Sequence, residues 1–277
     1  MTAKADLHMH TVHSDGILTV AQLLDECARR GLTTISITDH DSVEAFPEAI
    51  ERGAALGIEV IVGVELSAAF EDRDVHILGY FMDHQNERLR DYLVFFRRER
   101  VRRAERIVKK LNNLNVPLTM DEVMKCAGDG AVGRPHIATA LLNAGLTRSY
   151  QEAFERYIGN HCPAFEKKFQ LTPPDAVALI SSSGGLSFLA HPGKYITDDM
   201  LQHLIKAGLD GIEVIHPAHT NELIAHYRGV VNEYCMLESG GSDFHGGNKN
   251  DDATLGTMSV DPEVVSVMKR RLFAQKN

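Results

Sequence analysis

The chain has 277 residues, of which 44% are hydrophobic and 24% are charged, and its formal net charge is −9. These values are typical of a globular protein with a large core, and they exclude a disordered or low-complexity chain. Since no run of about 18 apolar residues occurs and a ligand motif follows the N-terminus at once, we expect neither a membrane span nor a signal peptide. The four scattered cysteines are typical of a reducing compartment, so we expect a cytoplasmic protein without a disulfide framework.

Strand-like and helix-like segments alternate along most of the chain. The predicted strands are Lys4–His10, Thr33–Thr38, Val60–Val64, Val75–Phe81, Gly185–Ala190, Gly211–Ile215 and Met236–Ser242. The predicted helices that accompany them are Val20–Arg30, Phe46–Leu56, Asp175–Ser182, Asp199–Ala207, Glu222–Glu233 and Glu263–Phe273. This alternation predicts βαβ units, and hence an α/β barrel built on a parallel sheet.

The alternation stops between about residues 87 and 170, where the pattern is helical only. A long helix is expected over Glu87–Leu114, a second after Arg134-Pro135-His136 and a third over Ser149–Ile158. We therefore predict a barrel domain of residues 1–86 and 171–277, interrupted by a helical insertion domain of residues 87–170.

Histidines and acidic residues recur where the predicted strands end. On the first strand, His8 and His10 share one face because successive side chains alternate. In barrels, functional groups gather at the carboxyl ends of the parallel strands, so these clusters should meet at one rim. The predicted metal ligands are His8, His10, Asp15, His40, Glu65, His76, His191, Asp243 and His245.

Several of these residues also have an ordinary interpretation. A lone strand histidine such as His76 is commonly a core or surface residue, and Asp15 fits a tight turn. Those interpretations would all have to hold at the ends of successive strands, so we favour a metal site. Nine mixed imidazole and carboxylate ligands suit two or three ions, and they favour Zn²⁺, Mn²⁺ or Fe²⁺ over Mg²⁺ or Ca²⁺. His216 and His219 either join this site or are polar loop residues.

The motifs together resemble the PHP (polymerase and histidinol phosphatase) family. They are Asp-x-His-x-His, Ser-Asp-Gly, Thr-Asp-His-Asp, Gly-x-Glu, Ala-His-Pro and Gly-Ser-Asp-Phe-His, within residues 1–85 and 171–277. The resemblance implies a distorted (β/α)7 barrel with a two- or three-metal phosphoesterase site. It also implies one ion on His8, His10, Glu65 and Asp243, a second on Glu65, His76 and His191, and a third on Asp15, His40 and His245. No family ligand is missing, so we expect an active enzyme.

The insertion resembles one branch of that family. Its segment 133–138, Gly-Arg-Pro-His-Ile-Ala, looks like that of the 3′,5′-nucleoside bisphosphate phosphatases and the related 5′-to-3′ exoribonucleases.

The expected chemistry is the cleavage of a phosphate ester. Three carboxylates with two or three divalent ions leave a net charge of roughly +1 to +3, which attracts an anion. The ions would lower the pKa of bound water, so the expected nucleophile is a metal-bound hydroxide and no side chain is assigned as catalytic. We expect two or three Mn²⁺ ions per chain, with Zn²⁺ or Fe²⁺ as alternatives.

A basic block suggests a second anion site in the insertion. Residues 97–110 hold eight Lys/Arg and two Glu, a net charge of +6, which leaves −15 for the rest of the chain. Arg100 falls within the apolar stripe of the long helix, so it needs either an internal acid partner or an anion-binding cleft. Arg134 and His136 begin a helix, and a helix N-terminus attracts anions. The candidate substrate-binding residues are Arg100, Arg103, Arg134, His136, Lys168 and Asn248, with a solvated surface as the alternative.

A second cationic site suits a substrate with two phosphates. Our first hypothesis is a phosphatase that removes the 3′-phosphate from adenosine 3′,5′-bisphosphate and leaves AMP. The second is a 5′-to-3′ exoribonuclease on short 5′-phosphorylated RNA, which should carry a longer basic track with aromatic side chains. A histidinol-phosphate phosphatase fits less well, because a monophosphate gives the arginines no role, and a non-enzymatic metal-binding module should have lost ligands. We infer no protein partner.

Overall fold

The computed structural model describes residues 3–275 except 72, 129, 168, 170 and 248–250. The chain divides into two compact units, which we call the barrel unit (Met1–Arg90 and Gln170–Asn277) and the insertion unit (Asp91–Phe169). The domain boundaries expected from the sequence remain a prediction.

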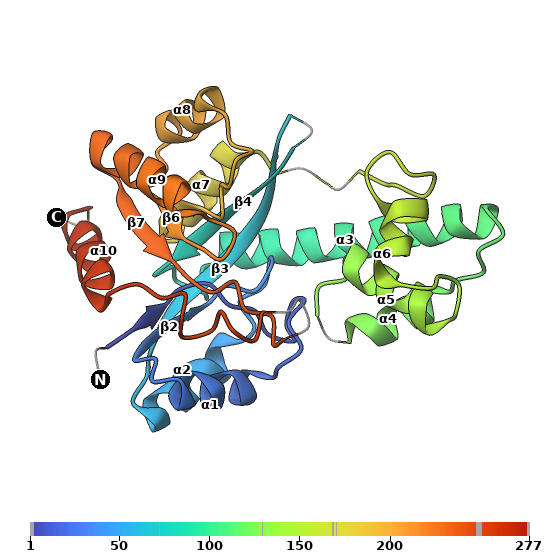
Figure 1. Ribbon diagram of the computed structural model, residues 1–277, viewed down its shortest axis with the longest axis horizontal. Coiled ribbons are helices and arrows are strands. Elements are labelled where there is room, and N and C mark those ends of the chain that lie inside the picture. The colour runs from blue at the N-terminus through green and yellow to red at the C-terminus, as the bar shows by residue number, and fades with distance from the viewer. Residues whose placement is uncertain are drawn as a thin grey trace. The chain divides into compact units, whose positions relative to one another are not determined.

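The barrel unit is built on a seven-stranded sheet. Its strands are β1 (Ala5–Asp6), β2 (Thr34–Ile37), β3 (Glu59–Phe70), β4 (Arg73–Tyr80), β5 (Leu186–Leu189), β6 (Gly211–Ile215) and β7 (Leu237–Gly240). They follow one another in the order β1 to β7 (Figure 1). A parallel bridge between Met9 and Phe244 joins the segments that follow β1 and β7, so the sheet is nearly closed. The predicted α/β barrel is confirmed.

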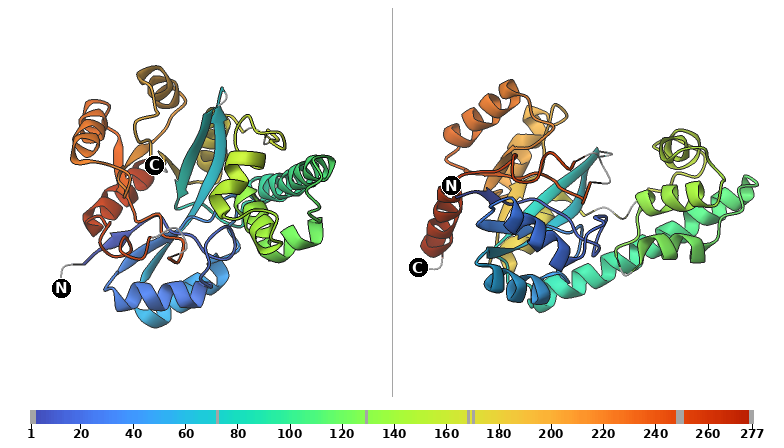
Figure 2. Two further views of the ribbon diagram at one scale, coloured as in Figure 1. Left: turned by 45° about the vertical axis from the view of Figure 1, so that its right-hand side comes forward. Right: turned by 60° about the horizontal axis from the view of Figure 1, so that its bottom comes forward.

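The expectation of an all-parallel sheet is wrong for β4. This strand runs antiparallel to both β3 and β5. Only two residues separate β3 from β4, and a parallel pair needs a crossover of a dozen residues or more. The two strands therefore form a hairpin, and β3 continues past the predicted end at Val64 to Phe70. Figure 2 shows this hairpin reaching beyond the shorter strands beside it.

Helices surround the sheet of the barrel unit (Figure 1). They are α1 (Val20–Arg29), α2 (Phe46–Leu56), α7 (Pro173–Ser182), α8 (Asp198–Lys206), α9 (Asn221–Glu233) and α10 (Pro262–Gln275). These agree with the predicted helices to within two residues at each end. In α1, the Thr19 side chain accepts a hydrogen bond from the backbone N–H of Gln22, which completes a capping box and fixes the start of the helix.

Large apolar side chains fill the barrel unit below the ends of its strands. The rings of Tyr80 and Phe188 meet edge to face at 5.1 Å, and both are fully buried. The Tyr80 hydroxyl donates a hydrogen bond of 3.0 Å to the Leu7 carbonyl. This packing joins β4 and β5 to the segment that follows β1, next to the residues that form the candidate site.

The insertion unit is helical and has its own core. Its elements are α3 (Glu87–Asn113, which begins in the barrel unit), α4 (Met120–Ala127), α5 (Arg134–Asn143), α6 (Tyr150–Ala153) and the π-helix η1 (Phe154–Ile158). Ile107 and Leu111 of α3 join Ile137 and Leu141 of α5 in one cluster of buried side chains. Within the part of the chain that the structure describes, no helix combines the length and apolar character needed to cross a membrane.

Candidate metal centre

All nine predicted ligands lie at one end of the barrel. His8 and His10 follow β1, while His191 and Asp243 lie beyond the ends of β5 and β7. Because β4 is antiparallel, its amino-terminal half lies at the same edge as the carboxyl ends of the other strands, and this brings His76 into the group. Thus the reversed strand supplies a residue to the same rim.

Glu65 of β3 is the centre of the group. Its carboxylate is almost fully buried, with 1% of the side chain exposed. The imidazoles within 3.4 Å of its two oxygens are those of His8, His10, His40, His76 and His191. Oε1 lies 2.7 Å from His76 Nδ1 and 2.9 Å from His191 Nε2, and those two nitrogens are 3.3 Å apart. One cation could therefore replace these three contacts.

Two further carboxylates flank Glu65. Asp243 Oδ1 lies 3.1 Å from His10 Nε2 and 3.3 Å from His8 Nε2. Asp15 Oδ1 lies 3.3 Å from His245 Nε2, and the His245 ring stacks on that of His10 at 4.2 Å. Asp15 is farther from His40, at 4.0 Å from Nε2.

Close backbone approaches bring these residues together. A Cβ at Gly16 would lie 2.4 Å from the His10 carbonyl oxygen, so glycine lets the turn with Asp15 fold over the end of β1. A Cβ at Gly241 would lie 2.5 Å from the His8 backbone nitrogen. His191 and Asp243 have φ values of 26° and 49°, in the left-handed region. Such strain costs about 1–3 kcal/mol per residue and is typical of functional sites.

Electrostatics favour ionised acids at this rim. Burial raises the pKa of Glu65, but the imidazoles of His40, His76 and His8 lower it more, so it lies well below its usual value. The pKa of Asp15 and that of Asp243 are likewise raised by burial and lowered more strongly by adjacent histidines. All three carboxylates are therefore available as anions for a cation.

The histidines divide into two electrostatic groups. Burial lowers the pKa of His40 well below its usual value, against the opposing effect of Glu65 and Asp15, and burial together with His245 lowers that of His10. The lowered pKa favours the neutral form of these two rings, which is the form that binds a metal. Burial also lowers the pKa of His8, but Glu213, Asp243 and Glu65 raise it more. A cation binding at His8 would therefore displace a proton.

The donor set fits divalent transition ions. Among the residues that the structure describes, four groups of three have ligand atoms within 4.8 Å of one another: His8, His10 and Asp243; His8, Glu65 and His191; His10, Asp15 and His245; and His10, His40 and Glu65. In the described residues, His40 Nδ1 is buried without a hydrogen-bond partner, although Glu65 Oε2 is 3.1 Å away. This arrangement, in which a buried imidazole nitrogen faces a carboxylate oxygen but forms no hydrogen bond with it, is the one expected if an ion binds between the two atoms. Mixed nitrogen and oxygen donors suit Zn²⁺, Mn²⁺ or Fe²⁺.

Three residues near the site, Glu213, Asp39 and Asp251, were not predicted from the sequence, whereas the sequence leaves His216 open between a place in the site and a polar loop. Glu213 of β6 accepts hydrogen bonds from His8 Nδ1 and the His191 backbone, and His216 contacts Asp243. Asp39 accepts hydrogen bonds from Thr11 N, Thr11 Oγ1 and Ser14 Oγ at 2.6–2.7 Å. Asp251 accepts from the backbone N–H groups of His245 and Gly247. An acid at the centre of the apolar strand Gly211–Ile215 was the available signal for Glu213.

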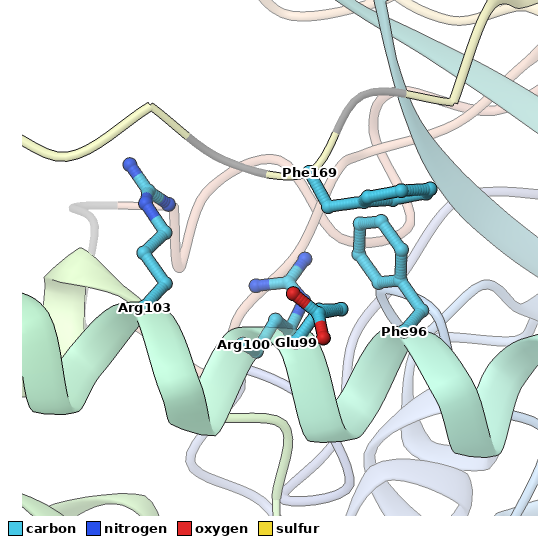
Figure 3. A pocket seen from close by; sticks show the side chains of 5 residues that line it. All are labelled: Phe96, Glu99, Arg100, Arg103 and Phe169. Carbon is cyan, nitrogen blue, oxygen red and sulfur yellow. The ribbon is translucent and has the colours of Figure 1, made fainter.

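Arg100 and Arg103 of α3 line a pocket within the insertion unit. Phe96, Glu99 and Phe169 complete its lining, as Figure 3 shows. The Arg100 guanidinium lies over the Phe96 ring, 5.3 Å from its centroid. Arg103 is buried, and its Nε donates to the Glu166 carbonyl at 2.8 Å. Arg103 therefore has a structural contact, and Arg100 borders the pocket beside the rings of Phe96 and Phe169.

The other candidate substrate residues are less well placed, or lie outside the described part of the chain. Arg134 donates to Asn160 Oδ1 at 2.9 Å, and its guanidinium lies 5.7 Å from the centroid of Phe165. His136 accepts a hydrogen bond from the backbone N–H of Gly133 and so caps its own helix. Lys168 and Asn248 are outside the described residues. Phosphate binding by these four residues remains a prediction.

A buried cluster of imidazoles and carboxylates at the rim of a nearly closed barrel is typical of metal-dependent hydrolases. Comparison with known proteins narrows this class, because the PHP domain family matches residues 6–159. The chain belongs to the PHP family.

The chain is also similar over most of its length to several curated proteins. It is 34% identical over 250 residues to a 5′-3′ exoribonuclease of Haemophilus influenzae, covering 88% of this chain and 91% of the relative. It is 31% identical over 252 residues to a 3′,5′-nucleoside bisphosphate phosphatase of Chromobacterium violaceum, covering 88% and 87%. It is 30% identical over 245 residues to a phosphoribosyl 1,2-cyclic phosphate 1,2-diphosphodiesterase of Eggerthella lenta, covering 87% and 94%.

Among solved structures, the chain resembles a protein of Bifidobacterium adolescentis assigned as a metal-dependent phosphoesterase. The TM-score is 0.88 at 30% identity, and the match covers 98% of this chain and 96% of the other. The three curated relatives are named for different phosphate esters. The comparisons therefore support a PHP phosphoesterase and leave the substrate open.

Proposed function

We propose that this protein is a metal-dependent phosphatase that removes the 3′-phosphate from nucleoside 3′,5′-bisphosphates, with adenosine 3′,5′-bisphosphate giving AMP and phosphate. The observation that carries the proposal is the convergence of six imidazoles and three carboxylates on one barrel rim. We assign the ions to His8, His10, Asp15, His40, Glu65, His76, His191, Asp243 and His245, and we expect two or three Mn²⁺ ions, with Zn²⁺ or Fe²⁺ as alternatives.

The residues of the site would each have a defined task. Bound ions would lower the pKa of a coordinated water and stabilise negative charge on the phosphate oxygens. Glu65 would compensate the charge of two ions, since its two oxygens face different histidines. The buried side chains of His8 and His10 would exclude bulk water from below the phosphate.

The second phosphate gives the insertion a role. Arg100 beside Phe96 offers a guanidinium for the 5′-phosphate and an apolar surface for the rest of a nucleotide. A charge-assisted hydrogen bond to a phosphate contributes about 1.5–3 kcal/mol, or roughly 10- to 150-fold in binding. A monophosphate such as histidinol phosphate would not use this residue.

An exoribonuclease is the second candidate, because the Haemophilus influenzae relative carries that name. The exposed rings of Phe95 and Phe169, which meet at 5.0 Å, favour it as well, since bases of a single strand stack on aromatic side chains. Both candidates need a phosphate at the metal centre and a second anion-binding group, and they differ in what lies beyond the first nucleotide of the substrate.

The test compares two substrates with the same Mn²⁺-loaded protein. We expect phosphate release from adenosine 3′,5′-bisphosphate that stops on chelation, at a higher kcat/KM than mononucleotide release from a 5′-phosphorylated tetraribonucleotide. Arg100→Met should lower kcat/KM for the bisphosphate about 10- to 150-fold and leave an aryl phosphate nearly unaffected. Arg98→Met, an exposed arginine on the same helix, is the control. Mononucleotide release without phosphatase activity would favour the exoribonuclease, and no release from either substrate would reject both.

A further inference from the structure

Strand β6 contributes no predicted ligand, yet its residue Glu213 reaches two of them. The side chain is fully buried. Its Oε1 lies 2.8 Å from His8 Nδ1, and its Oε2 accepts a hydrogen bond of 2.7 Å from the backbone N–H of His191. One carboxylate thus joins the segments that follow β1 and β5.

We propose that Glu213 is a positioning residue of the metal centre, which orients the His8 ring through Nδ1 and the His191 backbone through its N–H. This inference rests on the proposed metal site. It assigns Glu213 a task distinct from that of a ligand: both of its oxygens are used in holding other residues.

The contact to His8 fixes which nitrogen meets the ion. An ionised carboxylate only accepts hydrogen bonds, so His8 Nδ1 carries a proton and Nε2 is left as the donor to a cation. That Nε2 lies 3.4 Å from Glu65 Oε2 and 3.3 Å from Asp243 Oδ1. Glu213 therefore aims the free nitrogen at the two carboxylates that would share an ion with it.

The contact to His191 supports a strained backbone. His191 has a φ of 26°, a conformation that persists only where surrounding bonds hold it. Its neighbour Gly193 is held from both sides, since its N–H donates to His219 Nε2 at 3.1 Å and its carbonyl accepts from the Tyr227 hydroxyl at 2.7 Å. The His191 segment is thus fixed by β6 and by the residues that follow it.

The residue just beyond β6 extends this arrangement to Asp243. The backbone N–H of Ala218 donates to His216 Nδ1 at 3.1 Å, so a neutral His216 carries its proton on Nε2. That nitrogen lies 3.3 Å from Asp243 Oδ2, while Oδ1 faces the rings of His8 and His10. One strand and its following turn therefore orient ligands from three other strands.

Glu213→Gln tests the proposal. The amide oxygen of glutamine can accept a hydrogen bond from either His8 Nδ1 or the His191 backbone N–H, but its NH₂ group would then face the other N–H donor and could not bond to it. Chelator-stripped variant protein should keep its circular dichroism spectrum. In calorimetric titration with Mn²⁺ its affinity should fall about 10- to 100-fold, the usual effect of removing an orienting partner. Fewer ions should remain after gel filtration, as measured by atomic emission. Glu238→Gln on the neighbouring β7, which loses only an ion pair with Arg228, is the matched control and should bind Mn²⁺ like the wild type.

A second measurement needs no variant of Glu213. In ¹⁵N-histidine-labelled wild-type protein loaded with Zn²⁺, the His8 signals, assigned by their loss in His8→Gln, should show a protonated Nδ1 and a coordinated Nε2. Coordination through Nδ1 would overturn the proposal even if Glu213→Gln does not fold. Wild-type Mn²⁺ affinity and ion number in a folded Glu213→Gln protein would overturn it as well. A wild-type protein that shows this tautomer but cleaves no phosphate ester would reject the proposed function alone.

Discussion

Removing the charge of Glu65 should disable the metal centre with little change in the shape of its side chain. Glu65→Gln replaces a carboxylate that has 1% of its side chain exposed and five imidazoles within 3.4 Å. Breaking one partner of a buried charge pair costs about 3–5 kcal/mol, because the other charge stays desolvated without compensation. At 1.36 kcal/mol per factor of ten, this equals roughly 150- to 5,000-fold in ion affinity.

The assay is a Mn²⁺ titration of chelator-stripped protein, together with phosphate release from an aryl phosphate at saturating Mn²⁺. Glu59→Gln is a matched control at the opposite end of the same strand, where the carboxylate pairs with Lys269 on the surface and contributes about 0–1 kcal/mol. Equal ion number and affinity in Glu65→Gln and the wild type would refute the view that Glu65 joins two ions.

Three further outcomes follow from the same contacts. Removing the ions with a chelator should abolish activity, and adding Mn²⁺ should restore it. The free energy of unfolding should fall by about 2.7 kcal/mol relative to protein in Mn²⁺ at 100 times its dissociation constant. A thermal unfolding midpoint that does not change with Mn²⁺ would contradict this. Burial raises the pKa of Asp6 to about 7, above its ordinary value of 3.8, so its protonated form is stabilised in the folded protein and stability is lost as pH rises through 7. Asp6→Asn should therefore flatten the pH dependence of the free energy of unfolding of chelator-stripped protein between about pH 4 and 7, by at most about 4 kcal/mol, and an unchanged profile in urea unfolding would argue against it. Tyr80→Phe removes the hydrogen bond to the Leu7 carbonyl and should lower the free energy of unfolding by about 1 kcal/mol, measured by urea denaturation, whereas a cost near zero would mean that water replaces the hydroxyl.

Much of the barrel could be predicted because its elements follow regular periods. The apolar pattern of Phe46–Leu56 gives α2 with the same bounds in sequence and structure, and Gly211–Ile215 does so for β6. Strand direction is not encoded in such a pattern, and for that reason the antiparallel β4 was missed. In the insertion, α4 was missed although Thr119 and Glu122 form a capping box, and η1 differs from an α-helix only in its hydrogen-bond register.

The gathering of the nine candidate ligands could be inferred, but the residues that orient them could not. A ligand such as His191 is marked by its place at a strand end. Glu213 is marked only as an acid within an apolar strand, and the partners that reveal its task lie 205 and 22 residues away in the chain. Sequence position alone does not show which buried acid faces which ring, since that depends on the neighbouring strands of a closed sheet.

The rim of the barrel concentrates groups that oppose folding when no cation is present. Several buried carboxylates and imidazoles share one small volume, and His191 and Asp243 add strained backbone. Buried polar groups are stable only where each has a partner. Glu213 pairs with the second ring nitrogen of His8, and Asp39 holds the backbone of Thr11 beside His10, but neither contact compensates the charges of the ligand carboxylates. The ions would complete the compensation. The same cations that would activate a phosphate ester would therefore also stabilise this end of the fold, and loss of activity on chelation should be accompanied by loosening of the segments around His191 and Asp243 rather than of the apolar layer at Tyr80.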